Sequence, residues 1–426
     1  MAPLACPPNT AVSARISGAP LRVLALLVVS VSIFYMDRGN LSIAAPLLKD
    51  ELGISTAQLG VLLSSFFWTY AAFQIVSGWL VDRVGGRWVL AGGFCIWSVT
   101  TAATGVVHGF GMLLLLRLLL GMGESVAYPC YSKILASRFA ECQRGLANSL
   151  IDAGSKCGPA VGTLAGGLLM ARFGWRPIFI VLGLGSMIWL LPWLRCMPDS
   201  PPRLGGGSEK GPGIREILSK RSAWATFAGH FCSNYFLYFL LTWLPFYLIR
   251  ERHFSMNSMA GMGALAYVVM AVTTTATGWI SDRAIAAGAT PTRVRKACTG
   301  CGLGFTSIIA AVTAVSDPTL SMVFLLLACI AFGIYASSHW AITQTIAGPQ
   351  AAGKWSGLQN FVANLAGVAA PAVTGFVVQK TGHFFWAFTV SSTVVLAGAA
   401  VYLFALGPVE PVQWASNAVR ENKTAH

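Results

Sequence analysis

The chain has 426 residues, of which 55% are hydrophobic and only 10% are charged. A soluble domain carries about 25% charged residues, so this chain has too few to coat the surface of a soluble protein of its length. Its formal net charge of +14 comes from basic residues in short segments between apolar runs, a placement that suits lipid headgroups and argues against nucleic-acid binding.

Residues 1–21 precede the first apolar run and are predicted to form a cytoplasmic tail. The tail has no apolar core before a small-residue cleavage site, so the first run is expected to be a retained helix and not a signal peptide. A membrane-spanning helix needs roughly 20 apolar residues, and we identify twelve candidate runs in the sequence. They cover residues 22–48, 57–81, 88–107, 110–135, 146–171, 177–194, 222–249, 260–281, 297–315, 319–345, 355–379 and 384–407.

Residues 196–221 separate the sixth run from the seventh and are rich in Pro, Gly and basic residues, which indicates a flexible linker in the cytoplasm. We therefore expect one bundle over residues 22–195, a second over 222–407 and a cytoplasmic tail over 408–426. The runs are too long and continuous for the strands of a barrel, which leaves helices as the spanning elements. The predicted fold class is an all-α membrane protein with twelve transmembrane helices in two pseudo-symmetric six-helix bundles.

Short repeats support this division. The sequence GWLVDR, residues 78–83, follows the second run, and GWISDR, residues 278–283, follows the eighth. Parallel repeats of six helices are a known transporter architecture. Most of the 29 Lys and Arg residues lie in the tails and in the loops on the same side as the tails, which predicts a multi-pass protein of the cell inner membrane with both termini in the cytoplasm.

The intramembrane charges all lie in the first half. Each costs about 2.5–3.5 kcal/mol to insert, so each is a functional candidate. They are Asp37, Arg38, Arg117, Glu124, Lys133, Asp152 and Lys156. The expected spans of the second half offer only neutral polar side chains, so the first half is predicted to do the charge and proton work.

Arg38 and Arg117 are the candidates for binding an anion, because a guanidinium stays charged and its planar fork fits a carboxylate. The alternative is that each Arg only neutralises a neighbouring acid. Asp37 and Glu124 are the candidate proton carriers, since a desolvated carboxylate near an Arg can bind or release a proton as its surroundings change. The alternative for these two is a permanently ionised structural pair.

Asp152 and Lys156 are four residues apart and are expected to be neighbours on one helix face. One interpretation is an internal ion pair that allows the helix to hold two charges within the membrane. The other is that Lys156 contacts a second anionic or hydroxyl group of a substrate. Ser155 lies beside them and is a further candidate contact. Tyr35 and Tyr70 are candidates for hydroxyl contacts with a polyhydroxy acid.

The motif G-x-L-x-D-R-x-G-x-R at residues 78–87 resembles the loop signature of the major facilitator superfamily, and it lies between the second and third runs. This resemblance implies a two-bundle fold with a central cavity and alternating access. It also implies a gate that forms charge pairs in one state and breaks them in another. The gate candidates are Gly78, Asp82, Arg83 and Arg87, with Asp282 and Arg283 in the second half.

A narrower resemblance, to the anion:cation symporter family, is carried by YMDRGNLSIAAPLL, RLLLGMGESVAYP, YFLLTWLPFYL, GWISDRAIAAG and NLAGVAAPAVTG. It implies that acids at the positions of Asp37 and Glu124 carry coupling protons. It also implies that the substrate pocket includes Ser337, His339, Trp340 and Asn360. Sugar-acid carriers of that family often have Gln near Ser155, where this sequence has Ser-Lys.

The sequence therefore predicts a secondary active transporter that takes up a small organic anion, a sugar acid or other carboxylate, by proton-coupled symport. It is expected to work as a monomer, without metal or cofactor, and not as an enzyme. The alternative is a proton-coupled efflux antiporter of drugs or metabolites, because Gly154, Gly158, Pro159 and Gly162 form a run close to an antiporter signature. Two arginines in the cavity would disfavour cationic drugs.

Overall fold

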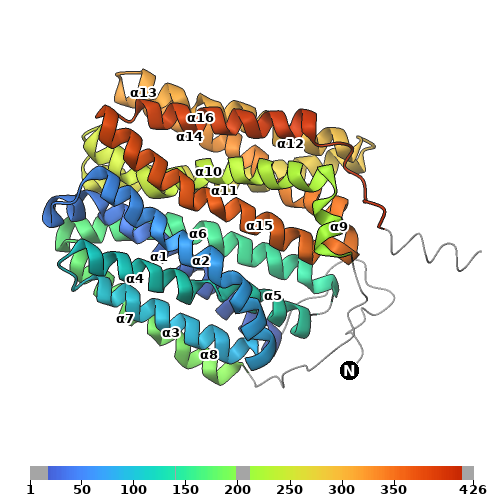
Figure 1. Cartoon of the computed structure of the whole chain (residues 1–426), viewed down its shortest axis with the longest axis horizontal. Coiled ribbons are helices and arrows are strands. Elements are labelled where there is room, and N and C mark those ends of the chain that lie inside the picture. The colour runs from blue at the N-terminus through green and yellow to red at the C-terminus, as the bar shows by residue number, and fades with distance from the viewer. Residues whose placement is uncertain (1–17, 140, 198–211, 415–426) are drawn as a thin grey trace, which may run out of the picture. The chain divides into compact units, whose positions relative to one another are not determined.

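A computed structural model of the chain describes residues 18–139, 141–197 and 212–414, and the regular elements within these ranges are all helices (Figure 1). In chain order they are α1 (Ala19–Leu52), α2 (Thr56–Val84), α3 (Gly86–Thr104), α4 (Phe110–Glu124), α5 (Ala127–Arg138), α6 (Glu141–Phe173), α7 (Trp175–Ser186), η1 (Met187–Trp189), α8 (Leu190–Cys196), α9 (Ile214–Leu218), α10 (Arg221–Arg250), α11 (Met256–Ala286), α12 (Pro291–Thr306), η2 (Ser307–Ala310), α13 (Ala311–Ala314), α14 (Pro318–Ala336), α15 (His339–Thr381), α16 (Phe385–Ala400) and η3 (Val401–Ala405).

The expected membrane spans coincide with these helices. In the described part of the chain, nine stretches are long and apolar enough to cross a membrane. They are Pro20–Leu52, Phe110–Leu135, Trp175–Cys196, Arg221–Arg250, Met256–Ala286, Pro291–Ala314, Pro318–Gly348, Ala351–Thr381 and Phe385–Ala405. The remaining long helices, α2, α3 and α6, occupy the positions expected for the second, third and fifth spans. The expectation of an all-α protein with twelve spans is confirmed.

One long helix serves two spans because it contains a glycine break. Within α15, Gly348 has φ 65° and ψ 172°, a backbone conformation that side chains with a Cβ rarely adopt. The break separates the tenth span, which ends at this residue, from the eleventh, which begins at Ala351. The two spans can therefore follow each other with a very short connection.

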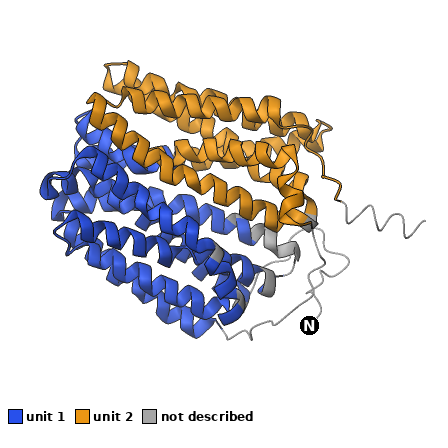
Figure 2. Cartoon of the chain, viewed as in Figure 1, with its two compact units in different colours: residues 1–205, 241–267 blue, residues 206–240, 268–426 orange. Residues whose placement is uncertain are grey.

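The chain divides into two compact units (Figure 2). Unit 1 comprises residues 1–205 and 241–267, and unit 2 comprises residues 206–240 and 268–426. The end of α10 falls in unit 1, where Arg250 forms an ion pair with Asp50 near the end of α1. The expected bundle boundaries at residues 195 and 222 stay a prediction.

The sequence repeat is also a structural repeat. The guanidinium of Arg83 lies 5.4 Å from the ring centre of Trp79, and that of Arg283 lies 3.8 Å from the ring centre of Trp279. Each pair occupies the C-terminal part of its helix, α2 in unit 1 and α11 in unit 2. The same cation–π contact therefore recurs at equivalent places in the two halves.

A second repeated contact joins the start of one span to the end of another. In unit 1, Arg87 at the start of α3 donates to the carbonyl of Leu194 in α8 at 2.7 Å. In unit 2, Lys296 near the start of α12 donates to the carbonyl of Leu406, just after η3, at 2.6 Å. The third span is thereby tied to the sixth, and the ninth to the twelfth.

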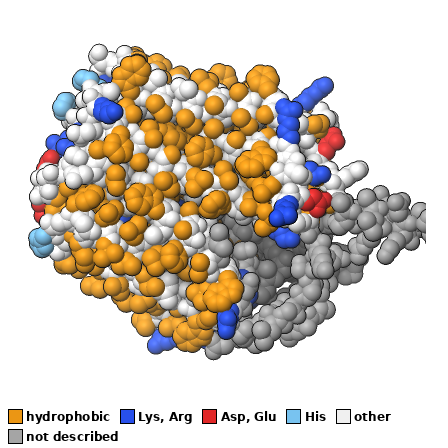
Figure 3. Space-filling model, in the orientation of Figure 1, with side chains coloured by type: hydrophobic (Ala, Val, Ile, Leu, Met, Phe, Trp, Pro, Cys, Tyr) orange, Lys and Arg blue, Asp and Glu red, His pale blue; other side chains and the backbone are white. Residues whose placement is uncertain are grey.

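The outer surface suits a lipid environment. In Figure 3 hydrophobic side chains cover most of the visible face, while Lys, Arg, Asp and Glu gather toward its ends. Large apolar side chains are exposed, among them Phe404 at 80% and Phe305 at 70%. A soluble protein rarely exposes such extensive apolar surface, so the surface agrees with a membrane-embedded chain.

Candidate functional site

Two spans are interrupted at their candidate site residues. The helix α4 ends at Glu124, and a short turn that begins with Ser125 separates it from α5. In unit 2, α14 ends just before Ser337 and Ser338, and α15 begins at His339. Discontinuous helices recur at the substrate and ion sites of transporters, because their free backbone groups and side chains can face a cavity.

The most buried charged contact in unit 1 joins spans one and four. The Nε of Arg38 on α1 donates a hydrogen bond to Oε2 of Glu124 on α4 at 3.1 Å. The two side chains are 2% and 0% exposed, respectively. Because a buried charge without a partner is costly, Glu124 can lose Arg38 only if another cation or a proton takes its place.

Aromatic side chains enclose the guanidinium of Arg38. Its Cζ lies 4.1 Å from the ring centre of Phe34, 4.3 Å from that of Tyr70 and 4.9 Å from that of Phe66. These distances are typical of cation–π interactions, and such interactions replace part of the hydration that the guanidinium loses on burial. Tyr70 is itself only 2% exposed. In this conformation a substrate could reach Arg38 only after these neighbours move.

Asp37 and Arg117 lie in the same unit and are equally buried, at 4% exposure each. The Nδ2 of Asn40 donates to Oδ1 of Asp37 at 3.2 Å, and the guanidinium of Arg117 lies 5.1 Å from the ring centre of Phe66. Within the described residues, Oδ2 of Asp37 and Nε of Arg117 lack a hydrogen-bond partner. We refer to the following side chains as the buried charged cluster: Asp37, Arg38, Arg117 and Glu124. When all four are ionised their charges sum to zero.

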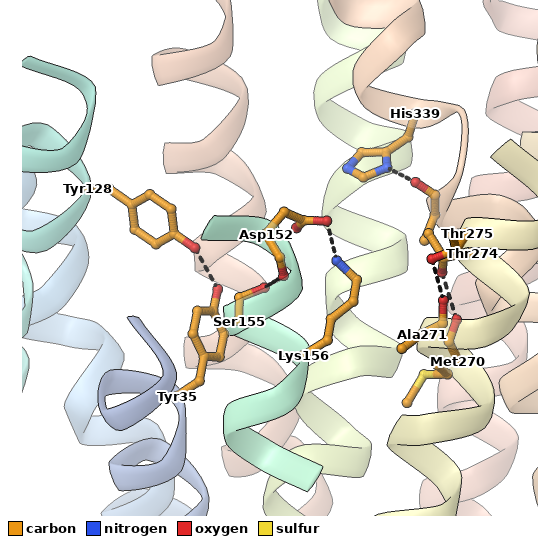
Figure 4. A network of polar contacts seen from close by, with 11 residues as sticks. Tyr35, Tyr128, Asp152, Ser155, Lys156, Met270, Ala271, Thr274, Thr275 and His339 are labelled. Atoms are coloured by element: carbon orange, nitrogen blue, oxygen red, sulfur yellow. Dashed lines mark hydrogen bonds and ion pairs between the residues drawn. The ribbon is translucent and has the colours of Figure 1, made fainter. Parts of the chain in front are cut away.

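A second charged pair in unit 1 is accessible. The Nζ of Lys156 lies 2.5 Å from Oδ2 of Asp152, and these side chains are 30% and 62% exposed, respectively. The expected contact between residues four apart on α6 is therefore confirmed. Figure 4 shows this pair together with Tyr35, whose hydroxyl lies 3.1 Å from that of Tyr128. The hydroxyl of Ser155 is used locally and donates to the carbonyl of Asp152 at 2.6 Å.

The accessible pair occupies a face of α6 that does not face α1. The α1 contact is made by glycines, since a Cβ at Gly158 would lie 2.4 Å from the carbonyl oxygen of Ser32. Lys156 and Thr163 are seven residues apart and thus share another face. Thr163 packs against Gly263 of α11, where an added Cβ would lie 2.7 Å from its methyl carbon. The face that carries Lys156 is therefore covered by protein farther along the helix, which argues against a lipid-facing position.

The candidates in unit 2 lie on the two parts of α15. The ring of His339 lies 5.1 Å from that of Trp340, centre to centre, and Trp340 and Asn360 are half-buried. The carbonyl of Asn360 accepts a hydrogen bond from Nδ2 of Asn364 at 2.8 Å. The Oδ1 of Asn364 in turn accepts from the hydroxyl of Tyr238 on α10 at 2.7 Å. The hydroxyls of Ser337 and Ser338 lie 3.2 Å apart.

Two residues that the sequence analysis did not select, His230 and Gln359, form a buried hydrogen-bond chain in unit 2. The hydroxyl of Thr343 donates to Oε1 of Gln359 at 2.7 Å. This fixes the amide so that its Nε2 can donate to Nδ1 of His230 at 3.3 Å. The ring of His230 lies 4.9 Å from that of His339. A polar residue inside an apolar run was the only sequence signal for either one.

The gate candidates lie at the ends of helices in their own units. Arg83, Asp282 and Arg283 are exposed, whereas Arg87 is half-buried. Gly78 lies within the last two turns of α2. Asp82 is placed on α2, but it falls outside the residues whose side chains the structure describes. The described arginines thus lie near helix ends, where Arg87 contacts the carbonyl of Leu194 and the other two pack on Trp79 and Trp279. The charge pairs expected of the gate stay a prediction.

The side-chain chemistry does not resemble a metal centre. Among the described residues, no group of three or more His, Cys, Asp or Glu side chains could hold a metal ion. The cysteines in these ranges are free thiols and include Cys298 and Cys301. The chemistry that the site offers is ion pairing, hydrogen bonding and stacking.

Comparison with known proteins agrees with this picture. The family model of the Major Facilitator Superfamily matches residues 27–371. The chain belongs to the major facilitator superfamily. It is 31% identical over 399 residues to a probable sulfoacetate transporter of Cupriavidus necator, covering 90% of this chain and 93% of that protein. It is 30% identical over 404 residues to a hexuronate transporter of Bacillus subtilis, covering 90% and 94%.

A solved structure supports the fold of this superfamily member. A bacterial homologue of the human lysosomal transporter Spinster, inward-facing and unoccupied, matches with a TM-score of 0.77 at 19% identity and covers 92% of this chain and 98% of its own. The resemblance found in the sequence is confirmed. The chain is a multi-pass membrane transporter and not an enzyme, and the two relatives above are named as transporters of organic anions.

Proposed function

We propose that this transporter takes up a small organic anion together with protons, as a monomer, by alternating access in the cell inner membrane with both termini in the cytoplasm. The substrate is a sugar acid or another carboxylate. Sequence relatives named for hexuronate and sulfoacetate support an acidic substrate. The names of these relatives say nothing of protons, so the support for proton coupling is the buried charged cluster.

The observation that carries the proposal is the ion pair between Arg38 and Glu124 at 3.1 Å. When a substrate carboxylate binds Arg38, it takes the position of the Glu124 carboxylate. Because Glu124 is fully buried, the displaced carboxylate is stable only with a proton. One substrate charge is thereby matched by one proton, so the two are carried together. Asp37 offers a second buried carboxylate for the same purpose.

An efflux antiporter is less well supported. Its main support was the glycine run of α6, and these glycines pack directly against α1. A Cβ at Gly154 would lie 2.7 Å from a side-chain carbon of Val31, and one at Gly162 would lie 2.7 Å from a side-chain carbon of Met36. Close helix packing therefore accounts for the small residues without an antiport mechanism.

Transport by purified protein in liposomes tests the proposal. Uptake of D-glucuronate, sulfoacetate, D-gluconate and D-glucarate is measured with the pH gradient in either direction. Symport predicts that an acidic exterior drives accumulation of at least one acid and that a protonophore abolishes it. An antiporter gives the opposite dependence on the gradient. Uptake that is indifferent to the gradient would refute proton coupling and leave an anion uniporter.

A further inference from the structure

We propose that Lys156 is a second anion subsite, so that the preferred substrate is an extended dianion with an acid group at each end. The inference rests on the proposed uptake of an organic anion, and it adds the charge and length of the substrate. It is carried by the accessible ion pair on α6, by the face of the helix that it occupies and by its level relative to Arg38.

The two cations differ sharply in accessibility. The side chain of Arg38 is 2% exposed, whereas that of Lys156 is 30% exposed. An anion can therefore contact Lys156 in this conformation, whereas Arg38 is enclosed by its neighbours. The partner of Lys156, Asp152, is 62% exposed, so an anion can displace it toward water without leaving a buried unpaired charge.

The position of Lys156 also suits a cavity. An ammonium group that faced lipid would be costly, and the same face of α6 is covered farther along by Gly263 against Thr163. On α1, the hydroxyl of Tyr35 pairs with that of Tyr128, and Figure 4 shows both tyrosines in the same view as Lys156. These hydroxyls are separate from the ammonium in this view, and they add donors that a carboxylate of the substrate can use.

The packing of α1 against α6 sets the spacing between the two cations. Close approaches place Gly158 beside Ser32 and Tyr35, and Gly162 beside Met36, so the two helices run in the same direction. Arg38 is then about six residues farther along this interface than Lys156, or roughly 9 Å along the axis. This is the axial component of the separation alone, and it already exceeds the distance between two acid groups on neighbouring carbons, so the second acid group belongs toward the other end of the substrate.

The test compares acids that differ only at one end. D-Glucarate is paired with D-gluconate, and adipate with 6-hydroxyhexanoate, so each dianion has a monoanionic control of similar length. Binding to the purified full-length protein is measured by calorimetry and by thermal shift. The wild-type protein should bind each dianion that it recognises at least about 10-fold more tightly than its monoanion, as expected for one added charge-assisted contact.

The variant Lys156→Gln should remove this preference and leave monoanion affinity within about 3-fold, as expected if only the second acid contacts Lys156. Lys156→Arg should keep the preference because the charge is retained, and Lys380→Gln, at an exposed position, serves as the matched control. Equal affinity for dianions and monoanions, or equal weakening of both by Lys156→Gln, would overturn the inference while anion transport stands. Failure of all four acids to bind or to be transported would count against both proposals.

Discussion

Arg38 on α1 and Glu124 on α4 form an ion pair at 3.1 Å in which neither side chain is more than 2% exposed. Two opposite charges from separate spans are thus removed from water together. Such a pair adds little net stability compared with apolar residues, but losing one partner strands the other. A buried pair of this kind is better suited to an exchange of partners, in which a substrate anion and a proton replace the original contact.

We predict that Arg38→Gln reduces anion uptake by about 100-fold or more, because the charged, planar group that receives the carboxylate is lost. Arg38→Lys should also transport poorly, since Lys keeps the charge but lacks the fork. Uptake is measured in liposomes with the amount of inserted protein determined in parallel. The double variant Arg38→Gln, Glu124→Gln removes both buried charges and should restore folding without restoring uptake. Near-normal uptake by Arg38→Gln would contradict its assignment.

Glu124→Gln separates coupling from binding. The amide imitates the protonated acid, so we expect accumulation driven by a pH gradient to fall to background while substrate exchange persists. For the same reason, the pH dependence of substrate binding should become flatter in the variant. Exchange of labelled for unlabelled substrate across liposomes measures the retained activity. A variant that still concentrates substrate would show that Glu124 is not an obligatory proton carrier.

The buried chain in unit 2 gives a stability prediction. Gln359 is fully buried and links Thr343 to His230. Gln359→Leu takes the amide donor away from Nδ1 of His230, whereas the hydroxyl of Thr343 can still donate to the carbonyl of His339. The expected loss is about 1–3 kcal/mol per unsatisfied group, visible as a lower melting temperature in detergent. Gln344→Leu, at an exposed position of the same helix, should change stability little. Equal stability of the two variants would mean that the chain contributes nothing measurable.

The glycines of α6 provide a test of the packing that places the site. A Cβ at Gly158 would lie 2.4 Å from the backbone oxygen of Ser32, so Gly158→Ala must push α1 and α6 apart. We expect a destabilisation of about 1–3 kcal/mol and reduced transport. Gly357→Ala is the control, since nothing lies within 4 Å of its Cβ position, and it should be neutral or slightly stabilising. Full activity of Gly158→Ala would contradict the proposed role of close packing.

The sequence predicted the spans because long apolar runs have few alternatives in a membrane. It also predicted the contact between Asp152 and Lys156, which depends only on helix periodicity and was confirmed at 2.5 Å. The repeat of GWLVDR and GWISDR correctly indicated equivalent positions, as the contacts of Arg83 with Trp79 and of Arg283 with Trp279 show. Local rules and periodicity were sufficient for these features.

Contacts between helices were beyond such rules. Arg117 and Glu124 share a helix face by spacing, yet the sequence holds no sign that Glu124 pairs with Arg38, which lies on another span. The break after Glu124 was also missed, although the sequence holds a signal for it, since Pro129 cannot donate to the carbonyl of Ser125, four residues earlier. Gln359 and His230 come from separate helices, so only the folded chain brings them together.

The last prediction compares the two ion pairs of unit 1. Asp152 and Lys156 are 62% and 30% exposed, so breaking this pair should cost no more than about 1 kcal/mol. A single change at Arg38 strands a buried acid and should cost several times more. We therefore expect Asp152→Asn, Lys156→Gln and the double variant to melt within a few degrees of the wild type in detergent. Uptake of dianions should nevertheless fall in Lys156→Gln and stay low in the double variant, because restoring neutrality does not restore the ammonium. A different result would contradict the assignment of Lys156: melting temperatures of the single variants far below the wild type, with both melting temperature and uptake recovered in the double variant. The pair would then serve only to neutralise two charges on a helix within the membrane.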